Sequence, residues 1–201
     1  MADRPQDIDV FISYKREERA LADRVSAALT GRGYTVVTDL NISTGATFGD
    51  AIEQMIVDAK LVIVLWTEAA AASPWVRAEA ERAFGLGKYL GVMVTPGSLP
   101  LILQPVNYLD LSADGLTDAN LAILTADATQ KLGPPQRGSI DAEAQTTALN
   151  DDFVVFQSVE RMGHEEGYEA YLREFPNGRF APVARKKLRE LRGWRRVFRI
   201  L

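Results

Sequence analysis

The sequence predicts an α/β fold, in which a parallel sheet is flanked by helices, followed by a small α-helical region. Short runs of apolar, β-branched residues alternate with segments whose apolar residues recur at helical spacing. The runs are mainly apolar and do not alternate with polar residues, as expected of strands that are buried on both faces of a sheet. The five predicted strands are residues 8–14, 34–38, 61–67, 89–95 and 108–111.

Helices are predicted in the segments between these strands. Leu21, Val25 and Leu29 share one helical face, and Gly31 and Gly33 end that helix. Similar spacing predicts helices over residues 52–59 and 74–85. Strands separated by helices imply right-handed crossovers and a flavodoxin-like sheet. Ligands of such sheets bind beyond the carboxyl ends of the strands, where the strand order reverses beside the first strand.

The chain is expected to have three parts. Residues 1–132 form the α/β domain, and residues 133–151 read as a linker because they carry two prolines and small polar residues without an apolar period. Residues 152–201 contain three short helical patterns, the last two separated by the turn Pro176, Asn177, Gly178. This last part is predicted to be a helical hairpin with a basic tail.

Composition excludes several classes of site. The 201 residues include no cysteine, which removes disulfides and thiolate chemistry, and one histidine, which removes a histidine-rich metal site. His164 lies beside Gly163 and two glutamates in a predicted turn and is not expected to be catalytic. The first seven residues are polar and lack the features of a signal peptide, and no apolar run reaches membrane-spanning length. A cytoplasmic location is therefore expected.

Charge is distributed unevenly along the chain. The net charge is −4, but residues 185–201 hold eight basic residues and one acidic residue. The first 184 residues then hold 15 basic and 26 acidic residues, a net charge of −11. Residues 193–201 also interleave arginines with apolar residues, which suits an anionic membrane, a nucleic acid or the acidic surface of a second copy. Of these three partners, a second copy is favoured, because it requires no other molecule. The alternative is that the tail binds nothing and is only the end of a helix whose apolar residues complete the hairpin.

The segment Ser73 to Glu79, SPWVRAE, carries the most chemical information. Ser73 suits a helix N-cap and Pro74 the first turn, so the helix is predicted to begin here. Trp75 and Glu79 are four residues apart and share one helical face. Val76 and its neighbours on an adjacent stripe are expected to pack on the sheet, which leaves Trp75 and Glu79 at its margin, facing the crevice.

An aromatic plane beside a carboxylate suits cleavage of the bond between nicotinamide and ribose in NAD+. Nicotinamide leaves as a neutral molecule, so no general acid is required, unlike in ordinary glycosidases. Glu79 would bind the ribose hydroxyls and offset the positive charge of an oxocarbenium-like transition state, and Trp75 would stack on a ring of the nucleotide. The alternative is that Trp75 is a packing residue and Glu79 a solvated helix carboxylate.

Three motifs in the expected order resemble those of Toll/interleukin-1 receptor (TIR) domains over residues 7 to 132. They are the first-strand motif DVFISYKREE, the loop 40–49 after the second strand, and SPWVRAE, which is similar to the helix that bears the catalytic glutamate of TIR enzymes that cleave NAD+. The resemblance implies a bacterial TIR domain that acts as an NAD+ nucleosidase in immunity or cell-death signalling. A cysteine that some relatives carry after the tryptophan is absent here.

The resemblance also implies roles for individual residues. Glu79 matches the catalytic glutamate, and NAD+ is a substrate, so no cofactor or metal is expected. The residues expected to contact the substrate are Trp75, Ser13, Tyr14, Lys15, Arg16 and Asp39. The residues expected in a loop over the site, or in an assembly contact, are Asn41, Ser43, Thr44 and Gly45. Some of these residues also have a purely structural interpretation. Lys15 and Arg16 could be a solvated run of charges at a helix start, and Asp39 could cap the loop. Trp66 is expected in the core.

The resemblance leaves three functions to compare. TIR enzymes generally become active on assembly, so a homo-oligomer or filament is expected, with a partner protein or ligand as the alternative trigger. The product is either linear or cyclic ADP-ribose. The second function is a non-enzymatic TIR interaction module, including an effector that mimics host adaptors. The third is a hydrolase similar to nucleoside deoxyribosyltransferases.

Two common nucleotide-binding motifs are excluded. The glycines Gly85, Gly87 and Gly91 do not have the spacing and context of a Rossmann motif, and the loop 45–49 does not have those of a P-loop.

Overall fold

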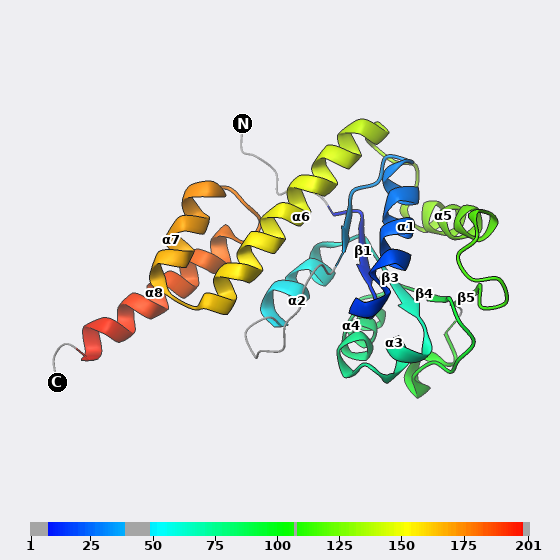
Figure 1. The fold of residues 1–201 in the computed structure, drawn as a ribbon, viewed down its shortest axis with the longest axis horizontal. Coiled ribbons are helices and arrows are strands. Elements are labelled where there is room, and N and C mark those ends of the chain that lie inside the picture. Colours follow the sequence, from blue (N-terminus) through cyan, green and yellow to red (C-terminus); the bar gives the residue numbers. More distant parts are fainter. Residues whose placement is uncertain (1–7, 39–48, 107, 199–201) are drawn as a thin grey trace. The chain divides into compact units, whose positions relative to one another are not determined.

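The computed structural model describes residues 8–38, 49–106 and 108–198 of the chain. Within these ranges, parallel strands form a five-stranded sheet in the order β2-β1-β3-β4-β5 (Figure 1). The strands are β1 (Val10–Ser13), β2 (Val36–Thr38), β3 (Leu61–Trp66), β4 (Tyr89–Met93) and β5 (Tyr108–Asp110). This order is the flavodoxin-like order, and it confirms the predicted fold class.

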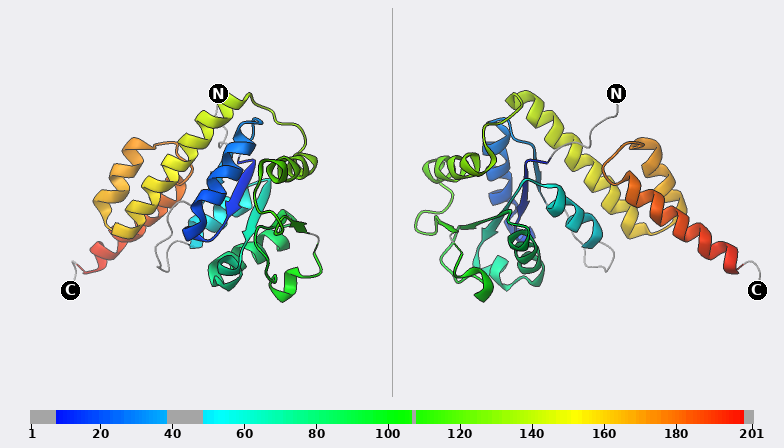
Figure 2. Two further views of the ribbon diagram at one scale, coloured as in Figure 1. Left: turned by 45° about the vertical axis from the view of Figure 1, so that its right-hand side comes forward. Right: turned by 180° about the vertical axis from the view of Figure 1, so that it is seen from behind.

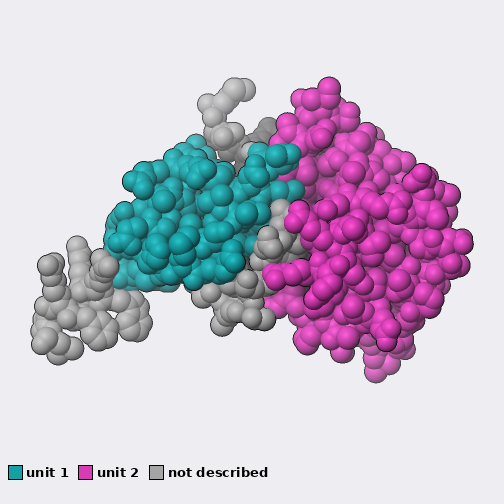
Figure 3. All heavy atoms as spheres, viewed as in Figure 1, with its two compact units in different colours: residues 1–6, 40–52, 147–201 teal, residues 7–39, 53–146 magenta. Residues whose placement is uncertain are grey.

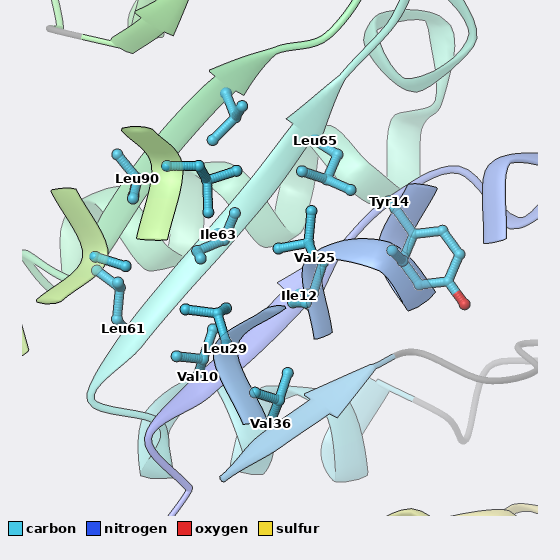
Figure 4. Packing of buried hydrophobic residues seen from close by; sticks show 14 of the residues in the cluster. Val10, Ile12, Tyr14, Val25, Leu29, Val36, Leu61, Ile63, Leu65 and Leu90 are labelled. Atoms are coloured by element: carbon cyan, nitrogen blue, oxygen red, sulfur yellow. The ribbon is translucent and has the colours of Figure 1, made fainter. Parts of the chain in front are cut away.

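One face of the sheet packs against two helices, α1 (Arg19–Thr30) and α5 (Asp118–Leu132). Val10 and Ile12 of β1 join a core cluster on this face with Val25 and Leu29 of α1 (Figure 4). Because side chains alternate along a strand, Phe11 and Ser13 point to the other face. The same alternation places Ile63 of β3 in this cluster.

The opposite face carries the helix α4 (Pro74–Gly85), which contacts β1, β3 and β4. A short helix, α3 (Glu68–Ala72), precedes it, and the hydroxyl of Thr67 caps α3 by accepting a hydrogen bond from the amide of Ala70 at 3.0 Å. Figures 1 and 2 show helices on both sides of the sheet. The remaining elements before α5 are α2 (Gly49–Asp58) and the 3-10 helices η1 (Arg16–Glu18) and η2 (Leu101–Leu103).

The predicted linker is wrong for residues 139–151, because they form the first half of α6 (Ser139–Met162). The side chains that α6 buries here, Ala142, Thr146 and Leu149, lie at helical spacing. Two of the three are small or polar, so the sequence showed no apolar period. Thr146 accepts a hydrogen bond from the amide of Val36 at 3.0 Å, which satisfies a backbone donor of the outer strand β2.

Contacts divide the chain into two compact units (Figure 3). The first contains the sheet, and its described parts are residues 8–38, 53–106 and 108–146. The described parts of the second are residues 49–52 and 147–198, where α7 (Glu165–Glu174) and α8 (Ala181–Phe198) pack together as the predicted hairpin. No helix in the described ranges is both long enough and apolar enough to cross a membrane.

An aromatic core stabilises the helical unit. The rings of Phe156 and Phe180 stack with centroids 4.8 Å apart, and Phe153 and Tyr171 pack against this pair. The buried carboxylate of Asp152 accepts hydrogen bonds from the Tyr171 hydroxyl at 2.5 Å and from a backbone amide at 2.6 Å. Burial raises the pKa of Asp152, and these hydrogen bonds offset part of that increase.

We predict that Gly91→Ala destabilises the fold by about 1–3 kcal/mol through steric overlap. A Cβ atom at residue 91 would lie 2.2 Å from the Tyr89 hydroxyl oxygen. The Tyr89 ring cannot move away freely, because its hydroxyl accepts a hydrogen bond from Nε1 of the buried Trp66 at 2.8 Å. Chemical denaturation measures the change. Gly85→Ala is the matched control, because no atom lies within 4 Å of its added Cβ atom, and unchanged stability of Gly91→Ala would refute the overlap.

A second stability prediction concerns the buried carboxylate of Asp9. It accepts hydrogen bonds from Lys60 at 2.7 Å and from the amide and hydroxyl of Thr35, both at 2.9 Å, and it pairs with Arg137 at 3.3 Å. Burial by itself would raise the pKa of Asp9, but the hydrogen bonds from Lys60 and Thr35 outweigh it, so the pKa lies below its ordinary value of 3.8.

A lowered pKa means that ionised Asp9 stabilises the folded state above the ordinary value, and that this stabilisation is lost as pH falls through the folded-state pKa. We expect Asp9→Asn to lower the free energy of unfolding at neutral pH, with a difference from wild type that shrinks below about pH 4. Urea denaturation across this range measures it. Asp114→Asn, at an exposed position, should change little, and a constant difference for Asp9→Asn at all pH values would contradict the assignment.

Candidate functional site

The candidate site lies at the carboxyl edge of the sheet, where β1 and β3 are neighbours and the strand order reverses. β1 ends at Ser13, and η1 follows it closely. β3 ends at Trp66, and Thr67 leads directly into α3 and then α4. The residues that follow these two strands are therefore brought together by the topology.

The central contact of the site joins Ser13 to Glu79. The Ser13 hydroxyl donates a hydrogen bond to Oε2 of Glu79 at 2.5 Å. Both side chains are buried, with 0% of Ser13 and 4% of Glu79 exposed to solvent. A carboxylate removed from water requires such donors, because an unmatched buried charge is costly. The contact fixes the carboxylate of α4 above the end of β1.

The local sequence explains how α4 positions Glu79. The Ser73 hydroxyl accepts a hydrogen bond from the amide of Val76 at 3.4 Å, and Pro74 occupies the first turn, so the helix begins as predicted. Val76, Ala80 and Ala83 are buried against the sheet. Glu79 extends this buried face, because it lies one turn from Val76 and from Ala83.

The expected position of Glu79 at the margin of the helix therefore needs a correction. Glu79 faces inward and is buried, whereas Trp75, one turn earlier on α4, is 38% exposed. Trp75 thus lies at the margin as predicted, and Glu79 does not. The reason is that the Ser13 hydroxyl supplies a polar contact within the otherwise apolar interface between α4 and β1.

The sequence did not predict a second contact at this edge of the sheet. The Thr67 hydroxyl donates a hydrogen bond to Oε2 of Glu18 at 2.7 Å, which ties η1 to the end of β3. The role of Thr67 as a helix N-cap could be recognised in the sequence, because threonine is a favourable N-cap residue and a helix follows it. The contact of Glu18 could not, because its partner is 49 residues away in the sequence. Together, Thr67 and Glu18 connect the segments that follow β1 and β3.

The other predicted contact residues lie in different surroundings. Tyr14 is 5% exposed and belongs to the core cluster on the α1 face, and Figure 4 shows its ring beside this cluster. Lys15 is partly exposed and pairs with Glu17 at 3.6 Å, and Arg16 is exposed. Trp66 is in the core, as expected. Asp39 and the predicted loop residues Asn41, Ser43, Thr44 and Gly45 lie outside the described residues.

A cavity of about 600 Å³ opens at the same edge, on the side of β4. Its lining includes Glu68, Arg77 and the loop 96–100, but none of Ser13, Trp75 and Glu79. Arg77 lies on the exposed side of α4, whereas Glu79 is buried. The cavity is therefore distinct from the contact between Ser13 and Glu79.

Neither the single histidine nor a cluster of acidic side chains adds a second candidate site in the described ranges. His164 caps α7 by accepting a hydrogen bond from the amide of Gly167 at 3.1 Å, which gives it a structural role. No group of three or more histidine, aspartate or glutamate side chains in the described ranges could hold a metal ion.

Comparison with known proteins adds an independent result. A family model described as "TIR domain" matches residues 10–125. The TIR domain of the Toll-related receptor TRR-2 from Hydra magnipapillata superposes with a TM-score of 0.51 at 20% identity, covering 60% of this chain and 98% of that domain. The TIR domains of the activated Roq1 resistosome, which recognises the effector XopQ, give a TM-score of 0.38 at 15% identity, covering 73% and 99%. No curated protein matches the sequence significantly.

We predict that the contact between Ser13 and Glu79 contributes to stability. Ser13→Ala removes a donor from a buried carboxylate and should cost about 1–3 kcal/mol. A double-mutant cycle with Glu79→Gln tests the pair, with free energies of unfolding as the readout. Because Ser13 acts on Glu79, its replacement should cost at least about 0.5 kcal/mol less in the Glu79→Gln background. Equal costs in the two backgrounds would show that the residues are not coupled.

Proposed function

Because the chain belongs to the TIR-domain family, with residues 10–125 matching the family model, we propose that it cleaves the nicotinamide–ribose bond of NAD+ with Glu79 as the catalytic carboxylate. The observation that supports this most is the Ser13–Glu79 hydrogen bond of 2.5 Å at the carboxyl edge of β1, with the exposed Trp75 one helical turn away. The site thus combines a held carboxylate and an accessible aromatic plane.

The proposed reaction needs few protein groups. The bond between C1′ of the ribose and the nicotinamide nitrogen breaks, and its electron pair leaves with nicotinamide, which becomes neutral. Water then forms the new bond to C1′ and releases a proton, giving ADP-ribose. In the cyclic variant, a nitrogen of the adenine of the same molecule takes the place of water. Which product forms depends on the nucleophile held near C1′.

Glu79 would act on the charge that develops during this reaction. Positive charge builds on the ribose as nicotinamide leaves, and a nearby carboxylate stabilises it most strongly where water is excluded. The burial of Glu79 supplies such an environment. Ser13 would act as a positioning residue, because its hydroxyl holds Oε2 in place. Trp75 would stack on the nicotinamide ring.

The burial of Glu79 also sets a condition on activity. A side chain that is 4% exposed cannot contact a ribose until neighbouring groups move. Such a change fits activation by self-assembly, in which a second copy completes the site, in immune or cell-death signalling. A dilute monomer should therefore turn over NAD+ slowly.

A non-enzymatic interaction module is the second candidate function. The same burial of Glu79 favours it, because the carboxylate already has the Ser13 hydroxyl as a partner and would then serve only the fold. In this case, the protein would bind other TIR domains without consuming NAD+. Measuring turnover over a wide range of protein concentration distinguishes the two functions.

The test is NAD+ consumption at high protein concentration, by wild type and variants that remain folded. Glu79→Gln should lower turnover by about 100-fold or more, as expected when a group that stabilises transition-state charge is removed. Ser13→Ala should lower kcat more than it raises KM, since it misplaces the carboxylate without removing a substrate contact.

Glu81→Gln is the matched control, because Glu81 is an exposed glutamate on the same helix, and it should retain wild-type turnover. Equal turnover by wild type and Glu79→Gln would remove Glu79 from the mechanism. No turnover by wild type at any concentration, together with binding to a TIR domain, would favour the interaction module.

A further inference from the structure

Some basic side chains of α8 have no acidic partner in the described part of the chain. Two of its arginines have partners: Arg185 donates to the carbonyl of Pro176 at 2.6 Å, and Arg192 pairs with Glu165 at 2.6 Å and with Glu169. Lys186 and Arg189 are exposed, and within the described part of the chain they make no ion pair or hydrogen bond. They are three residues apart, so they lie on one helical stripe.

The basic character continues toward the end of the chain. Residues 185–201 carry eight basic residues and one acidic residue, and the sequence WRRVFR at 194–199 places tryptophan and phenylalanine among arginines. Tryptophan and arginine are the residue types most enriched among those that dominate binding energy in protein interfaces. The end of α8 therefore has the composition of an interface with a surface that is both acidic and apolar.

In the sheet unit, exposed residues of these two kinds are concentrated in one stretch of the chain, around β5 and the start of α5. Residues 89–130 hold four aspartates and no lysine or arginine. Three of them, Asp110, Asp114 and Asp118, are exposed and lie within nine residues of one another. Hydrogen bonds from the side chain and backbone of Ser112 lower the pKa of Asp110, so it remains ionised at neutral pH.

The same stretch of the chain also exposes apolar side chains. Of the nine large hydrophobic residues that are exposed in the described ranges, four lie between residues 101 and 123. They are Leu101 (81% exposed), Ile102 (52%), Tyr108 (41%) and Ile123 (50%). Tyr108 belongs to β5, the outermost strand of the sheet, whose free edge would otherwise be open to pairing. We call the exposed acidic and apolar residues of the ranges 101–106 and 108–123 the β5 surface.

Several other acidic groups of the sheet unit have cationic partners. Asp9 pairs with Lys60 and Arg137, and Glu53 pairs with Arg82 at 2.9 Å. On the β5 surface, Arg24 lies 3.4 Å from Asp118, whereas Asp110 and Asp114 make no ion pair within the described residues. Both members of that pair are exposed, so it contributes little. The β5 surface therefore combines exposed aspartates that are mostly without cationic partners in the described ranges with exposed apolar side chains, which matches an arginine-rich helix.

From this complementarity of charge and apolar surface, we infer that α8 of one copy docks on the β5 surface of a second copy. The contact joins two different surfaces, so it is head-to-tail and propagates into rings or filaments. It involves neither Glu79 nor NAD+, and its outcome is therefore independent of the proposed catalytic role.

Sedimentation velocity without NAD+ tests the inference on the full chain. We expect wild type to self-associate with rising concentration, and added salt to weaken this association by screening. Lys186→Glu with Arg189→Glu should weaken it at least tenfold, and so should Asp110→Lys with Asp114→Lys. All four positions are exposed, so circular dichroism should be unchanged, and the thermal unfolding temperature should fall only slightly, because Asp110→Lys loses the exposed hydrogen bonds from Ser112.

A charge swap gives the decisive result. The chain with all four replacements restores opposite charges across the contact and should self-associate again. An equimolar mixture of the two double variants should also associate, because each retains one wild-type surface. Arg161→Glu with Arg173→Glu makes the same change of net charge at exposed positions in the same unit, and it should associate like wild type.

Two results would overturn the inference. One is self-association of both double variants with wild-type affinity. The other is a wild-type chain that stays monomeric while Lys186 and Arg189 mediate binding to vesicles of phosphatidylglycerol and phosphatidylcholine, or to a DNA duplex, because α8 would then serve a membrane or a nucleic acid.

Discussion

The buried hydrogen bond between Ser13 and Glu79 is the constraint on which the rest of the site depends. Burying a carboxylate is costly unless donors replace the water it loses, so Glu79 can face the sheet only where a hydroxyl meets it. The end of β1 provides that hydroxyl. The contact therefore sets the rotation of α4 about its axis, and this rotation leaves Trp75 partly exposed at the margin.

This geometry has opposite consequences for the two candidate functions. Exclusion of water strengthens the interaction of a carboxylate with a positive transition state, which favours catalysis. The same burial closes the carboxylate to substrate in the isolated chain, which favours an interaction role. The proposed activation by assembly would reconcile the two, because a second copy would rearrange the groups around the site without changing the fold of either sheet. Access to Glu79 would then be the variable that regulation controls.

Some charged side chains of the described ranges have oppositely charged neighbours, and others do not. Asp9 is surrounded by cations and hydrogen-bond donors, and Arg192 is held by two glutamates, so these charges serve the fold. Lys186 and Arg189 on α8 and the aspartates of the β5 surface are exposed, and most have no cation or anion beside them in the described ranges. Exposed charges of opposite sign on the two units allow one copy to bind another, because each copy carries both of the complementary surfaces.

The sequence by itself determined the fold class, the places of the strands along the chain and the start of α4. These follow from local signals: mainly apolar runs of strand length, helical spacing between them, and Ser73 and Pro74 at a helix start. It also placed Trp75 correctly at the margin of α4. The first half of α6 was missed, since Ala142 and Thr146 fill its buried positions without strong apolar character.

Tertiary structure decided the features that join distant residues. Ser13 and Glu79 are 66 residues apart, and Thr67 and Glu18 are 49 apart, so no local pattern could pair them. Tyr14 was drawn into the core cluster on the α1 face because the end of β1 lies beside α1. Local patterns record which face of an element is apolar, whereas a polar contact inside that face depends on what the neighbouring element presents to it, and only the packed structure contains that information.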